Sequence, residues 1–216
     1  MVRLIDLSHD IEAGMITYPG LPGPVISDHL SRIDSKANYA PGTEFLIGRI
    51  DMVGNTGTYL DTPFHRFEGG SDLSGLALDD VADLPGLCIE APGPEIGKEA
   101  VDGVDVTGKA VLFATGWDQH WGTDSYGDPS HSFVAPDLVD ALVAGGAVLV
   151  GIDSVNIDDT RGGERPAHTG LLAAGIQVVE HLTGLGQLVG RDFHFFAVPP
   201  KVSGFGTFPV RAFAIT

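Results

Sequence analysis

The sequence predicts an α/β domain, because short strand-like segments dominate it and one of its few helical segments lies between two of them. Residues 110–114 and 147–152 lack polar alternation, which is typical of strands that are buried on both faces of a sheet. Residues 168–174 favour a helix that ends before Gly175, and another strand-like segment follows at 176–179. This order predicts at least one strand–helix–strand unit.

The other expected strands are also short and rich in Val, Ile, Leu and Phe, which favour extended backbone. They lie at residues 3–7, 45–53, 86–90, 193–198 and 210–215. A helix is expected at 136–144, because Pro136 suits a first helical position and Gly145-Gly146 suits a helix end. A second, short helix is expected at 78–84, before Pro85.

Composition and charge narrow the class of protein. A chain of 216 residues with 43% hydrophobic residues suits one folded domain with a substantial core. The formal net charge of -17 disfavours nucleic-acid binding, because an acidic surface repels phosphate backbones. Cys88 is the only cysteine, which excludes an intrachain disulfide and a zinc site built from thiolates. Neither a signal peptide nor a membrane span is evident, so a cytoplasmic enzyme or binding protein without a membrane partner is expected.

The segment from Asn55 to His65 reads Asn-Thr-Gly-Thr-Tyr-Leu-Asp-Thr-Pro-Phe-His and concentrates side chains that can carry chemistry. It follows a strand-like segment and contains Gly57 and Pro63, so a shaped turn is expected. Asp61 and His65 could share a metal ion, or they could act as a base and the group that orients it. A purely structural hydrogen bond between the two side chains fits the spacing equally well.

This segment resembles the signature H-x-G-T-H-x-D-x-P-x-H of the cyclase and kynurenine formamidase superfamily. The matching residues are Gly57, Thr58, Asp61, Pro63 and His65, whereas Asn55 and Tyr59 stand where the family has its first two histidines. The similarity continues, in order, along nearly the whole chain. It covers Asp6-Leu7-Ser8-His9, Thr115-Gly116-Trp117-Asp118, Gly151-Ile152-Asp153, Asp158, His168, Leu171-Leu172, Glu180 and Pro209-Val210-Arg211-Ala212.

The resemblance implies a fold and a metal site. The implied fold is a single α/β domain over the whole chain, with a mixed central β-sheet of the swivelling β/β/α type, in a homodimer or higher homo-oligomer. Asp61, His168 and Glu180 match the family's second metal position. The first metal position is lost, because Asn55 and Tyr59 are weak ligands. The family pattern therefore implies at most one divalent ion per chain, zinc or manganese, and a protein without metal is also compatible with it.

The implied activity is hydrolysis of an amide, formamide, lactam or lactone, or the reverse ring closure, on a small-molecule substrate. His65 matches the family's general acid–base, and a metal ion held by Asp61 would polarise the substrate carbonyl. The candidate substrate-binding residues are Asn55, Tyr59, Arg66 and Trp117, with Tyr18 and Trp121 as further aromatic candidates.

Two alternative functions remain open. One is a metal-free cyclase or lyase that uses Asp61 and His65, with the two altered motif positions donating hydrogen bonds to an oxyanion. The other is an inactive protein that binds a small metabolite.

Overall fold

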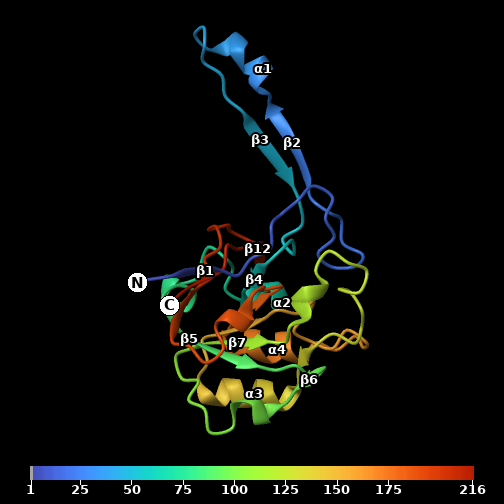
Figure 1. The fold of residues 1–216 in the computed structure, drawn as a ribbon, viewed down its shortest axis with the longest axis vertical. Helices are drawn as coiled ribbons and strands as arrows, with labels where there is room; N and C mark the ends of the chain where they lie inside the picture. The colour runs from blue at the N-terminus through green and yellow to red at the C-terminus, as the bar shows by residue number, and fades with distance from the viewer. Residues whose placement is uncertain (1) are drawn as a thin grey trace.

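The computed structural model describes residues 2–216 and is built around a nine-stranded mixed β-sheet (Figure 1). Four adjacent strands run parallel to one another: β5 (Leu84–Glu90), β7 (Ala110–Ala114), β9 (Leu149–Ile152) and β10 (Gln177–Glu180). Antiparallel strands extend the sheet on both sides. They are β11 (Phe193–Phe196), β13 (Phe213–Ile215) and β1 (Leu4–Asp6) beyond β5, and β4 (Tyr59–Asp61) and β12 (Thr207–Pro209) beyond β10. The predicted α/β fold with a mixed central sheet is confirmed.

Two helices pack on one face of the parallel strands. α4 (Pro166–Ala173) joins β9 to its parallel neighbour β10, which is the strand–helix–strand unit that the sequence predicts. α3 (Pro136–Gly145) has its proline in the first turn and ends at Gly146, whose φ of 75° lies in the left-handed region. The two helices contact each other and share one apolar cluster with the sheet.

The central strands are buried on both faces. Val111 and Phe113 of β7 pack into a cluster with Leu138 of α3 and Leu171 of α4. Leu112 belongs to a second cluster, which also includes Ile5 of β1 and Phe195 of β11 among the antiparallel strands. Successive side chains of a strand point to opposite faces, so the lack of polar positions in β7 reflects two apolar layers.

The helix expected at 78–84 is wrong. Only Leu78–Asp80 form a short 3-10 turn, and Leu84 already belongs to β5, where it pairs with Phe195 of β11. The physical reason is Pro85, because the residue before a proline is driven toward extended backbone. The chain around Leu84 therefore begins the sheet strand β5 instead of ending a helix.

Shorter elements complete residues 2–216. The remaining helices are α1 (Arg32–Ser35) and α2 (Pro63–Arg66), with further 3-10 turns at Lys36–Asn38, Lys98–Val101, Trp117–His120 and Leu185–Gln187. Two small sheets pair β2 (Val25–Leu30) with β3 (Ile47–Asp51), and β6 (Glu95–Ile96) with β8 (Phe133–Val134). Among the described residues, every helix is too short or too polar to cross a membrane.

Residues 25–51 project from the body as an arm, formed by β2 and β3 with α1 at its tip (Figure 1). Every residue of β3 is exposed, and so is nearly all of β2. Ile26 and Ile50 face each other across the two strands, and they are 47% and 54% exposed. The strand expected near residues 45–53 is therefore present, but it pairs within the arm and not with the central sheet.

Candidate metal-binding active site

Strand β4, which crosses the motif where a turn was expected, places two motif residues at the centre of the site. Tyr59 and Asp61 lie two residues apart on β4, so their side chains point to the same face. β4 lies between β10 and β12, and the strand register sets Tyr59 opposite Glu180 and Asp61 opposite Thr207. All four residues are buried. Strand pairing therefore brings together side chains that are more than a hundred positions apart in the sequence.

A hydrogen-bond chain through Thr207 orients His65. The Thr207 hydroxyl donates its single proton to Asp61 Oδ1. It must therefore accept its other bond from His65 Nδ1, which lies 2.8 Å away. Because Nδ1 holds the proton, Nε2 of His65 keeps a lone pair that is free to take up a proton or bind a metal ion. His65 lies on α2, which Pro63 begins directly after β4 and Thr62, and its side chain is 35% exposed.

Asp158 fixes the orientation of His168. The Asp158 carboxylate accepts the backbone N–H groups of Ala167 at 2.6 Å and His168 at 3.1 Å, at the start of α4. The same carboxylate accepts a bond from His168 Nδ1 at 2.6 Å. His168 Nε2 is thereby directed toward Asp61 and Glu180, 3.6 Å from one oxygen of each. A carboxylate that holds one ring nitrogen while the other is presented is the usual support for a metal-binding histidine.

The second oxygen of Asp61 tests whether these residues fit a metal ion. Asp61 Oδ2 is buried and has no hydrogen-bond partner among residues 2–216, which is costly for a carboxylate. Its distance of 3.6 Å from His168 Nε2 is close to the roughly 3.4 Å expected between two ligands of a tetrahedral ion. Asp61, His65 and His168 each offer a ligand atom, and these atoms all lie within 4.8 Å of one another. Carboxylate and imidazole donors suit zinc or manganese, so the residues fit a divalent ion.

The charges around His168 also favour a cation. Burial lowers the pKa of the His168 imidazole, but the carboxylates of Glu180, Asp158 and Asp61 outweigh burial and hold that pKa well above its ordinary value. Burial likewise opposes ionisation of Asp61, yet contact with His168 and the hydrogen bond from Thr207 bring the Asp61 pKa below its ordinary value. Several buried carboxylates thus converge on one imidazole, and a divalent ion would balance their charge.

Glu180 and Tyr59 belong to a second hydrogen-bond chain, which is saturated. Tyr59 donates to Glu180 Oε2 at 2.6 Å, and the Ile157 N–H donates to Oε1 at 2.6 Å. The Tyr59 hydroxyl accepts from His181 Nε2 at 3.2 Å, and His181 Nδ1 accepts from the Tyr126 hydroxyl at 2.8 Å. Burial lowers the pKa of His181 to about 3 and raises those of Glu180 to about 7 and of Tyr59 well above its ordinary value. His181 is therefore neutral and Tyr59 remains a phenol. Every donor in this chain of hydrogen bonds has an acceptor.

A cavity of about 320 Å³ lies beside these residues. Most of the predicted site residues line it, namely Asn55, Tyr59, His65, Arg66, His168 and Glu180. Asp61 is completely buried behind this wall. Trp117 is not one of the lining residues, and its indole nitrogen donates to the backbone carbonyl of Tyr126 at 2.9 Å.

The cavity also has lining residues that sequence reasoning missed. Tyr18 lines it, as an aromatic candidate should, but Leu21, Asn156 and Arg165 were not anticipated. Arg165 precedes His168 by three residues at the start of α4, so its spacing from that histidine was the available signal. Leu21 and Asn156 lie in loops, and no pattern in the sequence marks them.

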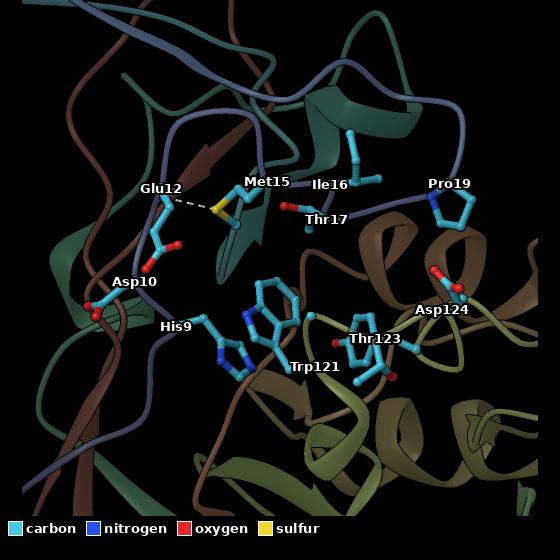
Figure 2. Close-up of a pocket in the computed structure, with 13 residues that line it drawn as sticks. His9, Asp10, Glu12, Met15, Ile16, Thr17, Pro19, Trp121, Thr123 and Asp124 are labelled. Atoms are coloured by element: carbon cyan, nitrogen blue, oxygen red, sulfur yellow. Dashed lines mark hydrogen bonds between the residues drawn. The ribbon is translucent and has the colours of Figure 1, made fainter.

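A second, larger cavity of about 860 Å³ is lined by residues of the segments 9–19 and 121–127 (Figure 2). Thr17 and Pro19 line this cavity, whereas Tyr18 between them lines the smaller one. In its wall, the ring of His9 stacks on Trp121 with centroids 3.8 Å apart. It contains none of the candidate metal ligands, so the smaller cavity is the one that belongs to the active site.

Known proteins are similar to this chain over almost its whole length. A family model named Cyclase, described as "Putative cyclase", matches residues 5–159. Kynurenine formamidase of Salinibacter ruber (strain DSM 13855 / M31) is 27% identical over 217 residues, which cover 98% of this chain and 96% of that protein. A solved structure described as a "potential metal-dependent hydrolase with cyclase activity" matches with a TM-score of 0.80 at 25% identity, over 100% of this chain and 98% of its own. Isatin hydrolase A from Labrenzia aggregata, bound to benzyl benzoate, shares the fold with a TM-score of 0.84 at 21% identity, over 100% of this chain and 94% of its own.

Proposed function

The chain belongs to the cyclase family, and on this basis we propose that it is a metal-dependent hydrolase of a carbon–nitrogen bond other than a peptide bond, in a formamide or a lactam. The similarity to a kynurenine formamidase supports this class of reaction. The observation that carries the proposal is a pair of atoms, Asp61 Oδ2 and His168 Nε2. The first is buried without a hydrogen-bond partner in the described part of the chain, and the two lie 3.6 Å apart. This pair lies next to His65 and a cavity of about 320 Å³.

One divalent ion, zinc or manganese, would be held by Asp61, His168 and Glu180. Both Glu180 oxygens already accept one hydrogen bond, but a carboxylate oxygen has a second lone pair for a metal. His65 is the other possible third ligand, because its Nε2 is also free. We assign the ligand role to Glu180, which leaves His65 for proton transfer. When bound, the ion would polarise the substrate carbonyl and make a water molecule more acidic.

His65 then moves the proton that hydrolysis requires. Its Nε2 accepts a proton from water as the water oxygen forms a bond to the carbonyl carbon. The same nitrogen returns the proton to the leaving nitrogen as the carbon–nitrogen bond breaks, so the products are a carboxylic acid and an amine. Thr207, held by Asp61, keeps the imidazole in the tautomer that this step needs.

Chelation and reloading test this proposal. Protein purified without a metal-affinity tag would be assayed on a panel of aryl formamides and on isatin, before and after exhaustive chelation. We expect hydrolysis that is lost with the metal and restored by zinc or manganese. Turnover that survives complete removal of the metal would contradict the proposal and favour the metal-free cyclase or lyase.

We also propose that the arm of residues 25–51 is the surface on which two copies of the chain meet. Apolar side chains exposed in a group on a projecting hairpin favour association, because the pairing removes them from water. Ile26 and Ile50 form such a group across β2 and β3. Light scattering should give a mass of about twice 22.6 kDa. The double variant Ile26→Ser, Ile50→Ser should shift it toward the monomer, whereas Val198→Ser, at an exposed site on the body, should not.

A further inference from the structure

We infer that the substrate of this site carries a carboxylate group, which Arg66 and Arg165 bind. The inference rests on the proposed function, because it assigns a substrate class to the same cavity. Arg66 and Arg165 both line the cavity of about 320 Å³. They are therefore two positive charges beside the reacting bond, in a chain whose formal net charge is -17.

Neither guanidinium is neutralised by the protein. Among residues 2–216, the lysines and arginines that pair with a carboxylate within 4.0 Å do not include Arg66 or Arg165. Arg161, four residues before Arg165, shows the contrast, because it pairs with Asp159 at 2.8 Å. Arginines that stay unpaired in an acidic protein, and that face a cavity, have electrostatic attraction available for an anionic ligand.

Backbone carbonyl groups hold the guanidinium group of Arg165 in place and leave part of it free to bind a ligand. Its Nη1 donates to the backbone carbonyl oxygens of Gly162 at 2.9 Å and Glu164 at 2.7 Å. A longer bond of 3.3 Å reaches the backbone carbonyl oxygen of Asp159. These bonds occupy one of the three nitrogens. The other two, Nε and Nη2, have no acceptor among the residues that the structure describes and remain available as donors toward a ligand.

Arg66 is held in a complementary way. Its Nε donates to Thr169 Oγ1 on α4 at 3.2 Å, and its guanidinium lies over the ring of Phe67, 5.2 Å from the centroid. Both Nη groups remain without a protein acceptor among the described residues. Two anchored guanidinium groups with free donors match the planar, two-oxygen geometry of a carboxylate. A neutral formamide or lactam would leave both charges unused.

Binding of benzoate and benzamide tests the inference without requiring turnover. Isothermal titration calorimetry would compare the wild type with Arg66→Gln and Arg165→Gln, at equal metal content verified by elemental analysis. The matched control is Arg191→Gln, which removes the same charge from an exposed residue that does not line this cavity. We expect benzoate to bind the wild type at least ~10-fold more tightly than benzamide, and to lose ~10-fold or more in each site variant but not in the control.

Two results would overturn the inference. One is equal affinity for the two probes, or no binding of benzoate. The other is benzoate binding that survives both site substitutions, since a carboxylate bound only to the metal would behave in this way. Hydrolysis of N-formylanthranilate and of formanilide is measured separately. If neither is hydrolysed, the proposed function is weakened, but the benzoate result still decides whether the cavity selects a carboxylate.

Discussion

Tyr59 and Asp61 lie two residues apart on the same strand, yet their polar atoms are satisfied in opposite ways. The Tyr59 hydroxyl donates to Glu180 and accepts from His181, and the chain continues to Tyr126. Asp61 keeps one buried oxygen, Oδ2, without a hydrogen-bond partner among residues 2–216. We call the part of the site around the Tyr59 hydroxyl the saturated half, because its hydrogen bonds are complete without an ion. The part around Asp61 and His168 is the unsatisfied half. Because the Tyr59 hydroxyl is already bonded to Glu180 and His181, we propose that no ion binds in this half of the site.

The largest effect should come from His65, at the edge of the unsatisfied half. We expect His65→Ala to lower kcat/KM on a true substrate by at least ~100-fold, because acid–base catalysis typically contributes that much. The fold should survive, since the side chain is 35% exposed. Steady-state kinetics and circular dichroism check both parts.

The control for this prediction is His194→Ala, an exposed histidine paired with Asp83 on the surface. It should leave kcat/KM unchanged. Intact turnover in the His65 variant would remove this residue from the mechanism.

A smaller effect should follow from loosening the support of His168. Asp158→Asn keeps the size of the side chain but weakens the bond to His168 Nδ1 and the cap of α4. We expect metal affinity to fall by ~10- to 100-fold, as is usual for a carboxylate behind a metal-binding histidine. Competition with a fluorescent chelator would measure this change. Unchanged metal affinity would mean that the unsatisfied half of the site, to which His168 belongs, does not hold the ion.

The saturated half should respond in stability and not in metal binding. Tyr126→Phe leaves His181 Nδ1 buried without a donor. The free energy of unfolding should fall by about 1–3 kcal/mol, while the metal content stays the same. Tyr39→Phe, at an exposed site on the arm, is the matched control. Loss of metal in Tyr126→Phe would show that the two halves are not independent.

The sequence predicts the fold and part of the site well, for identifiable reasons. The apolar run of β7 predicts a two-sided strand, and Pro136 with Gly146 predicts the ends of α3. Motif spacing also places His65 in the site cavity. Each of these signals is local in the sequence.

What the sequence does not predict depends on contacts between distant segments. Thr207 reaches Asp61 only because β12 pairs with β4. The Tyr59–His181–Tyr126 chain likewise joins residues from separate loops and strands, and Arg165 is anchored by backbone carbonyls that no residue pattern reveals. That Trp117 binds substrate stays a prediction.

The metal content of the purified protein tests the contrast between the two halves most directly. Elemental analysis of the native chain should find no more than one divalent ion, held in the unsatisfied half with Asp61. The double variant Asn55→His, Tyr59→His breaks the saturated half and supplies two imidazoles, so it should gain or strengthen a second position. Two tightly held ions in the native protein would contradict this account, because they would show that Asn55 and Tyr59 leave the first metal position intact.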